Sequence, residues 1–262
     1  MTKIVLITGA SSGIGRQVAI KAAEQGFSLI LVARRMDRLT ELANQLFKMY
    51  QTNVLVIKCD LTDSAQIERM VAKSIERFQR IDVLINCAGY GSFKSYDQFS
   101  YADYELMFKT NTLSMMYLSQ LVAKQMELQK AGHIIIIASV AGKIATKSST
   151  AYSATKFAMI GFANALRLEL ASKNIHVTTV NFGPVATEFF EHDSDSKSYY
   201  NKVKLMALDV DKAAQIISDQ IDGKHLIQRE INSPAYFGIL SNLYQLFPRI
   251  GDSITRHLVN LK

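Results

Sequence analysis

Residues Ile4-Val5-Leu6-Ile7-Thr8-Gly9-Ala10-Ser11-Ser12-Gly13-Ile14-Gly15 decide the fold of this 262-residue chain. The run Lys3–Thr8 is short and rich in β-branched residues, which predicts a buried strand. The glycines that follow predict a tight turn into a helix, which we expect to end near Gly26. Such a turn lets the backbone approach a pyrophosphate, and the helix N-terminus stabilises its negative charge. The stretch therefore predicts a strand, turn and helix that bind a dinucleotide.

The rest of the chain repeats this alternation of strand and helix. Short apolar runs predict further strands at 29–33, 54–58, 82–85, 133–138 and 175–180, with helices between them. Alternating elements of this kind form a Rossmann-type, doubly wound parallel sheet flanked by helices, and ligands bind beyond the carboxyl ends of its strands. We expect an α/β fold with a single domain over residues 1–262, because no linker or low-complexity segment divides the chain.

A second informative stretch is Tyr152-Ser153-Ala154-Thr155-Lys156, which begins a run with helical character. A spacing of four residues places the tyrosine and the lysine on one helix face. At about 5 Å and an effective dielectric constant of about 20, a lysine ammonium stabilises a phenolate by roughly 3 kcal/mol. That attraction would lower the tyrosine pKa by about two units, toward the range of a general acid or base. Taken alone, such a pair is weak evidence of catalysis and more often lies on a solvated helix face.

Three motifs together resemble those of the short-chain dehydrogenase/reductase family, in its NADP-preferring subgroup. They are the glycine turn 8–15, the strand-end residue Ser139, and Tyr152 followed four residues later by Lys156. Their order and separations match the family pattern, and the resemblance covers roughly residues 3–190. It implies an oxidoreductase that uses a nicotinamide cofactor.

The resemblance also implies a catalytic set of four residues. Tyr152 would exchange a proton with the substrate oxygen, and Ser139 would hydrogen-bond and orient that oxygen. Lys156 would bind the nicotinamide ribose and lower the pKa of Tyr152. Asn111 would kink a helix predicted over 99–130 and hold a water behind the lysine, although it can also be read as an ordinary polar helix residue.

By the same resemblance, the cofactor contacts residues at several strand ends. The expected cofactor-binding residues are Gly9, Ser11, Ser12, Gly13, Ile14, Gly15, Arg34, Arg35, Asp60, Leu61, Asn86, Ala88, Gly89, Tyr152, Lys156, Pro184, Val185 and Thr187. Asp60 would contact the adenine, or could instead be a helix cap or turn residue. Thr187 would hold the carboxamide. Two positions depart from the family pattern: Cys87 stands where an asparagine is usual, and Phe182 precedes Gly-Pro in place of the usual Pro-Gly.

Residues at the end of the second predicted strand indicate the choice of cofactor. An acidic residue there would bind the ribose 2′-hydroxyl of NAD. This chain has Ala33 at that place, followed by Arg34 and Arg35. A guanidinium suits a 2′-phosphate through paired hydrogen bonds, and Ser11 is near enough in the turn to help. We therefore expect NADP(H), against the alternative of exposed arginines at a helix start.

Composition limits the other classes of function. The net charge is +7, but the lysines and arginines are spread along the chain, which favours a solvated basic surface or an anionic-ligand site over a nucleic-acid partner. Cys59 and Cys87 are far apart and predict free thiols in a reducing compartment. The five histidines have no metal-ligand spacing, so we expect no metal. With no signal peptide or membrane-length apolar run, we expect a cytoplasmic protein.

The last third of the chain departs most from the family. Residues at about 188–208 are polar and aromatic and read as a substrate lid. After a short strand predicted at 228–232, apolar stripes at 236–247 and at Ile250, Ile254, Leu258 and Leu261 predict a helical tail over about 233–262. The tail would pack on its own subunit or on a partner subunit of a homodimer or homotetramer. Binding to a membrane surface is the alternative for this segment, and otherwise we expect no membrane association.

The sequence thus predicts an NADP(H)-dependent oxidoreductase of small-molecule substrates. It would reduce a carbonyl to a secondary or primary alcohol, or catalyse the reverse reaction, by hydride transfer with Tyr152 as general acid or base. Two alternatives remain open at this point. One is a 3-oxoacyl-carrier reductase, and the other is a sensor or scaffold that binds NADP without turnover.

Overall fold

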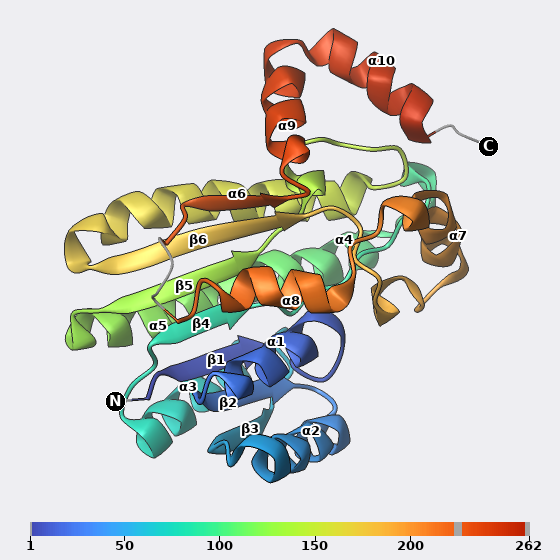
Figure 1. The fold of residues 1–262 in the computed structure, drawn as a ribbon. Coiled ribbons are helices and arrows are strands. Elements are labelled where there is room, and N and C mark those ends of the chain that lie inside the picture. Colours follow the sequence, from blue (N-terminus) through green and yellow to red (C-terminus); the bar gives the residue numbers. More distant parts are fainter. Residues whose placement is uncertain (1, 223–226, 260–262) are drawn as a thin grey trace.

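The computed structural model describes residues 2–222 and 227–259, and the predicted α/β architecture is confirmed (Figure 1). In this described part of the chain, seven parallel strands form one sheet in the order β3-β2-β1-β4-β5-β6-β7. Their bounds are β1 Ile4–Thr8, β2 Ser28–Ala33, β3 Val54–Lys58, β4 Val83–Asn86, β5 Gly132–Ile137, β6 Ile175–Phe182 and β7 Glu230–Ser233. The expected last strand is therefore present, shifted by a residue or two toward the C-terminus.

Helices cover both faces of the sheet. The helices α1 (Gly13–Glu24), α2 (Met36–Tyr50) and α8 (Val210–Ser218) pack on one face, and α3 (Ser64–Phe78), α5 (Ser114–Gln129) and α6 (Thr150–Leu170) pack on the other. Successive strand residues point to opposite faces, so Val5 and Ile7 join the first core while Leu6 joins the second. Both faces are thus buried, which explains why the strands read as continuous apolar runs.

The order of the strands reverses between β1 and β4. The chain moves outward from β1 to β3 and then returns to lay β4 along the other side of β1, with Ile7 paired to Leu31 on one side and to Ile85 on the other. In open α/β sheets, ligands bind in the crevice at such a reversal, beyond the carboxyl ends of the strands. The turns after β1 and β4 therefore border the expected site.

The helix predicted over residues 99–130 is present, with an interruption. After a 3-10 turn, η1 (Tyr96–Gln98), the chain forms α4 (Tyr101–Phe108), a π-helical turn, η2 (Lys109–Leu113), and α5. In η2 the Ser114 N–H donates to the Lys109 carbonyl, one residue further back than in an α-helix. Asn111 lies inside this turn and is fully buried. Single π-helical turns of this kind occur frequently at functional sites.

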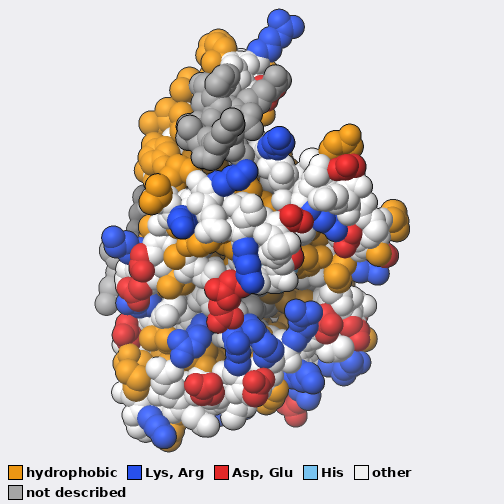
Figure 2. Space-filling model, turned by 90° about the vertical axis from the view of Figure 1, so that its right-hand side faces the viewer, with side chains coloured by type: hydrophobic (Ala, Val, Ile, Leu, Met, Phe, Trp, Pro, Cys, Tyr) orange, Lys and Arg blue, Asp and Glu red, His pale blue; other side chains and the backbone are white. Residues whose placement is uncertain are grey.

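The C-terminal tail forms two helices, α9 (Tyr236–Leu246) and α10 (Pro248–Val259), which rise from the body of the molecule (Figure 1). On this single chain, large apolar side chains of α9 stay exposed, for example Ile239 at 67% and Leu246 at 71%, so the expectation that the tail packs on its own or a partner subunit stays a prediction. Figure 2 shows hydrophobic side chains gathered along the upper left edge, at the height of these helices. Of the predicted second stripe, Leu261 lies outside the described residues. No helix in the described ranges has the length and apolar character needed to span a bilayer.

Candidate active site

The turns after β1 and β4 are joined by Thr8. Its Oγ1 accepts hydrogen bonds from the backbone N–H groups of Cys87, at 3.0 Å, and Ala88, at 3.1 Å. Gly9 follows with a φ of +70°, a left-handed conformation that favours glycine. Gly15, in the first turn of α1, packs so closely on Gly9 that an added Cβ would lie 2.5 Å from the Gly9 carbonyl oxygen. The glycines thus bring α1 directly behind the turn, as binding of a pyrophosphate at its N-terminus requires.

Basic side chains border the far end of this turn. Arg35 donates hydrogen bonds to the hydroxyl oxygens of Ser11, at 3.1 Å, and Ser12, at 2.8 Å. Arg34 lines the same cleft. In Figure 2, Lys and Arg side chains gather in the lower half of the face, below the hydrophobic edge. Two guanidinium groups and two hydroxyl groups therefore lie at this end of the cleft, and such groups suit the binding of an anion.

Asp60 is both a turn residue and a lining residue of the cleft. Its Oδ1 accepts hydrogen bonds from the backbone N–H of Thr62, at 3.0 Å, and from the Thr62 hydroxyl, at 2.8 Å. These bonds, the backbone one foremost and with help from Arg34, hold the pKa of Asp60 below its usual value. Asp60 is thus fixed as a carboxylate at the edge of the cleft, so the two readings of this residue are compatible.

Two predicted site residues do not line the cleft. The Asn86 side chain is buried and donates a hydrogen bond to Ser119 Oγ of α5 at 2.9 Å, so it supports the turn from the opposite layer. The Asn111 amide accepts from the Tyr90 N–H at 2.9 Å and donates to the Tyr90 carbonyl at 2.8 Å and to Thr155 Oγ1 at 3.1 Å. These bonds use both of its N–H donors. Asn111 therefore fixes the chain after β4 against α6 from behind the site.

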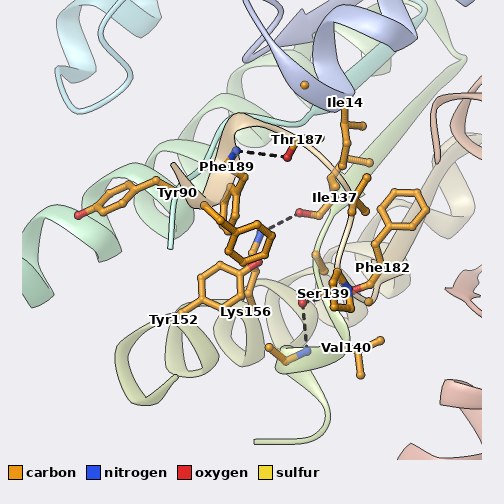
Figure 3. Close-up of a pocket in the computed structure, with 18 of the residues that line it drawn as sticks. Ile14, Tyr90, Ile137, Ser139, Val140, Tyr152, Lys156, Phe182, Thr187 and Phe189 are labelled. Atoms are coloured by element: carbon orange, nitrogen blue, oxygen red, sulfur yellow. Dashed lines mark hydrogen bonds between the residues drawn. The ribbon is translucent and has the colours of Figure 1, made fainter. Parts of the chain in front are cut away.

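The cleft brings together Tyr152, Lys156 and Ser139, as Figure 3 shows. Tyr152 and Lys156 lie one turn apart on α6 and are 8% and 6% exposed. The Lys156 ammonium donates to the Ile137 carbonyl at 2.9 Å and lies 5.6 Å from the centre of the Tyr152 ring. Ser139 follows β5, accepts a hydrogen bond from the Ala141 N–H at 3.1 Å and donates to the Phe182 carbonyl at 3.3 Å. Three polar groups from two elements thus face one space.

Burial decides the electrostatics of this group. Desolvation raises the pKa of Tyr152 well above the ordinary value for a phenol, and the hydrogen bond with Ser139 only partly opposes it. Desolvation also lowers the pKa of Lys156 to about 8. The expected lowering of the Tyr152 pKa by Lys156 is therefore wrong for this structure, in which removal of water from the phenol is the largest cause of the shift and raises the pKa. Tyr152 is held as a neutral phenol, which is a proton donor.

Phe182, one of the two departures from the family pattern, is accommodated in the site. Its side chain is 3% exposed and belongs to the core beneath the sheet end, where it also lines the cleft. Its carbonyl oxygen accepts the hydrogen bond from Ser139. The other departure, Cys87, lines the cleft beside Lys156, and burial raises its pKa to about 12, so it is a neutral thiol.

Aromatic side chains cover Tyr152 and its neighbours. The ring of Phe93 lies 5.3 Å from that of Tyr152, and Phe189 lies 5.8 Å from it. Phe93 also stacks on Tyr199 of α7 (Ser194–Val203) at 4.2 Å. At the start of this covering segment, the Glu188 carboxylate pairs with Arg38 at 2.9 Å and with Arg35 at 3.8 Å. Residues 188–207 therefore reach from the basic end of the cleft to a position over Tyr152, where a lid was predicted.

One cavity of about 940 Å³ joins the glycine turn, Arg34 and Arg35 with Ser139, Tyr152 and Lys156. Its lining includes the following predicted residues: Gly9, Ser11, Ser12, Gly13, Ile14, Gly15, Arg34, Arg35, Asp60, Leu61, Ala88, Gly89, Ser139, Tyr152, Lys156, Pro184, Val185 and Thr187. It also includes Tyr90, Phe93, Ile144 and Thr146, which lie in the loops 90–100 and 143–149 that the sequence predicts to shape the substrate pocket. The lining residues that sequence reasoning missed belong to the tail, among them Tyr236, Leu240, Leu243 and Phe247. The apolar stripe of the tail was visible in the sequence, but its spacing does not reveal that it faces the cavity.

Comparison with known proteins finds dehydrogenases and reductases of one family. A sequence profile of the family described as short chain dehydrogenase matches residues 3–198. A dehydrogenase/reductase SDR family protein 7-like protein of Dictyostelium discoideum is 36% identical over 97% of this chain and 80% of its own length. A 3-ketodihydrosphingosine reductase of Bos taurus is 30% identical over 91% of this chain and 73% of its own length.

Solved structures share the fold. A short-chain dehydrogenase from Sphingobium yanoikuyae in complex with NADPH superposes with a TM-score of 0.80 and 29% identity, covering 93% of each chain. A short chain dehydrogenase/reductase from Burkholderia phymatum in complex with NAD superposes with a TM-score of 0.85, covering 95% of each chain. At 21% identity the second likeness shows the fold alone.

Proposed function

This chain belongs to the short-chain dehydrogenase family, and we propose that it is an NADP(H)-dependent oxidoreductase that interconverts a carbonyl compound and an alcohol. The observation that carries this proposal is the meeting of Tyr152, Ser139 and Lys156 in the same cavity as the glycine turn and the two arginines. The cofactor-binding groups and the proton donor thus share one site, as hydride and proton transfer to one substrate requires.

The residues present fit a nicotinamide dinucleotide. The glycine turn would receive the pyrophosphate, Arg34 and Arg35 the 2′-phosphate, and Lys156 the nicotinamide ribose. When bound, the cofactor supplies or accepts the hydride. The NADPH complex of the Sphingobium yanoikuyae relative and the reductase name of the bovine relative support this choice. The absence of a carboxylate at Ala33 supports NADP(H) over NAD(H).

The chain's own residues would perform the proton transfer. In the direction of reduction, the Ser139 hydroxyl would turn its proton from the Phe182 carbonyl to the substrate oxygen and orient that oxygen, and the neutral Tyr152 phenol gives its proton to it. Because Tyr152 and Lys156 are buried, the donors at this point act in a low dielectric, where they stabilise a developing alkoxide strongly. The Lys156 ammonium stabilises the resulting phenolate until the proton is replaced.

The rate of reduction is expected to depend on the protonation of Lys156. Since burial lowers the pKa of Lys156 to about 8, kcat/KM should be level near pH 6–7 and fall as the pH rises through about 8. Cys87, with a pKa of about 12, and Tyr152, whose pKa is also raised, stay neutral over this range. The measurement is a pH profile of kcat/KM for wild type and Lys156→Met. The variant should be slower and lack the fall near pH 8. A wild-type profile that stays level to pH 10 would contradict the assignment.

Gly15→Ala is expected to weaken the binding of NADPH by at least about tenfold. The added Cβ would lie 2.5 Å from the Gly9 carbonyl oxygen, so the turn that receives the pyrophosphate must move. Gly161→Ala in α6 is the control, because nothing lies within 4 Å of its added Cβ. The dissociation constant, followed by NADPH fluorescence, should rise only for Gly15→Ala. Equal constants for the two variants would count against a cofactor seated on this turn.

The direct test of the proposed function is a steady-state assay. Aldehydes, ketones, diketones and secondary alcohols are offered to the purified chain with NADPH, NADH and their oxidised forms. Oxidation of NADPH that depends on a carbonyl compound supports the proposal. Tight binding of NADPH with no turnover of any compound, by wild type and Tyr152→Phe alike, would contradict it and favour a binding role.

A further inference from the structure

We propose that the substrate is an uncharged carbonyl compound with a long hydrocarbon chain, and that α9 and the start of α10 form the wall along which this chain lies. The inference rests on the proposed function and names the class of its substrate. It begins from the continuity of the cavity, whose lining runs from Ser139 and Tyr152 to the tail helices. The tail contributes Tyr236, Leu240, Leu243, Tyr244, Phe247 and Ile250 to that lining.

The tail is held against the catalytic end of the cavity by close contacts. Phe237 packs on Gly183, where an added Cβ would lie 3.0 Å from the Phe237 ring. Gly183 and Pro184 follow β6, and Pro184 lines the cavity with Ser139. Further along, Gly251 of α10 packs on the Tyr244 ring of α9, so the two helices form one unit. The tail is therefore packed against the segment that follows β6, close to the proposed reacting groups.

The chemistry of this wall suits a hydrocarbon. Of the described residues from 236 onward that line the cavity, none carries a charge. The Tyr244 hydroxyl donates to Asp252 at 2.8 Å and so is already paired. Outside the tail, the lining also includes the apolar residues Ile144, Phe190 and Met206. A hydrocarbon chain in contact with both sets of residues would meet apolar surface on each, and burial of that surface favours binding.

The charged groups of the cavity have other roles. Arg34, Arg35 and Asp60 lie at the cofactor end, and Lys156 lies beside the catalytic tyrosine. Glu188 pairs with Arg38, and His192 contacts the Asp193 carboxylate at 2.9 Å. The substrate end thus offers no free ionic partner among the described residues, which favours an uncharged substrate over an anionic one.

The exposure of the wall indicates that its occupant is a ligand of the cavity. Leu243 and Phe247 line the cavity, yet they are 48% and 55% exposed, so their apolar surface is only partly covered. A bilayer or a second copy of the chain would cover chiefly the outward residues Ile239 and Leu246, which do not line the cavity. A hydrocarbon chain of a substrate whose carbonyl lies at Tyr152 would instead cover Leu243 and Phe247.

The test is a series of 2-alkanones with four to twelve carbons and NADPH, on the full-length protein. Each methylene that the wall covers should raise kcat/KM by about fourfold until the chain is longer than the wall. Leu243→Gln should lower the ratio of kcat/KM for 2-decanone over 2-butanone by about tenfold or more. Leu246→Gln, one helical turn away and outside the cavity, is the matched control and should keep the wild-type ratio.

The outcomes separate this inference from the proposed function. Turnover of short ketones with a flat or falling series would overturn the inference and leave the proposed function standing. If no ketone is reduced, the melting temperature with NADP⁺ and 2-decanol decides. A rise for wild type and Leu246→Gln that is absent for Leu243→Gln supports the apolar site, and no rise overturns it. Co-sedimentation with phosphatidylcholine–phosphatidylglycerol liposomes that Leu246→Gln abolishes and Leu243→Gln does not would also overturn it, in favour of a membrane surface.

Discussion

Tyr152→Phe is expected to lower kcat by about 10² to 10⁴, the usual range for loss of one acid–base group. The phenol is buried, its raised pKa keeps it protonated, and Ser139 shares a hydrogen bond with it. Phenylalanine removes the proton and leaves the ring. Because the ring makes the contacts with Phe93 and Phe189, the cover of the site should stay in place.

The measurement for this variant has two parts. The value of kcat is determined on a substrate that the wild type reduces, and the dissociation constant for NADPH is determined by titration. Only kcat should fall, because the hydroxyl acts on the substrate oxygen. Full turnover by Tyr152→Phe would show that the proton comes from another group. A parallel loss of NADPH affinity would show that the phenol serves mainly to bind the cofactor.

The second large effect concerns the choice between NADPH and NADH. These cofactors differ only by the 2′-phosphate, so discrimination depends on groups near that atom. One or two charge-assisted hydrogen bonds from Arg34 and Arg35, each worth roughly 1.5–3 kcal/mol, would favour NADPH by about 10- to 1000-fold. Arg34→Ala should lose most of this preference by weakening NADPH alone. Ala33→Asp should go further and favour NADH, because Ala33 lines the cavity and a carboxylate there repels the phosphate.

The structure adds a control to this experiment. Arg35 is held by Ser11 and Ser12 of the glycine turn, whereas Arg34 lies beside Asp60. Arg35→Ala therefore separates the contributions of the two guanidinium groups. The quantity compared is the ratio of kcat/KM for the two cofactors in wild type and in each variant. A wild type that prefers NADH, or an unchanged ratio in Arg34→Ala, would refute the assignment.

Local sequence was sufficient for much of the fold and the cofactor end of the site. The strands could be predicted because both faces of the sheet are buried, which gives continuous apolar runs. The glycine turn could be predicted because the close packing at Gly9 and Gly15 leaves no room for a side chain. Asn86 was predicted to contact the cofactor, but its side chain does not line the cavity. Alternation along β4 turns its side chain toward Ser119 of α5, and this direction follows from the register of the strand.

Long-range packing explains what the sequence could not show. The spacing of Tyr152 and Lys156 correctly placed both on one helix face, but it says nothing of how much water each loses. The aromatic cover of Phe93 and Phe189 comes from segments almost a hundred residues apart. The spacing of apolar residues in the tail likewise predicted helices, but it did not show that their apolar face lines the cavity. Such features depend on contacts between distant segments, which no local pattern encodes.

Burial of Lys156 also lowers the stability of the folded state. Its pKa falls from 10.5 to about 8, so holding it charged at neutral pH costs the folded state about 3 kcal/mol. Because the folded state binds this proton less tightly than the unfolded chain, the penalty is complete below pH 8 and disappears as the pH rises toward 10.5. An uncharged residue at this position would relieve the penalty and remove the charge that the proposed proton transfer uses. On the proposed function, Lys156 is therefore a residue of α6 that lowers the stability of the fold and serves the reaction.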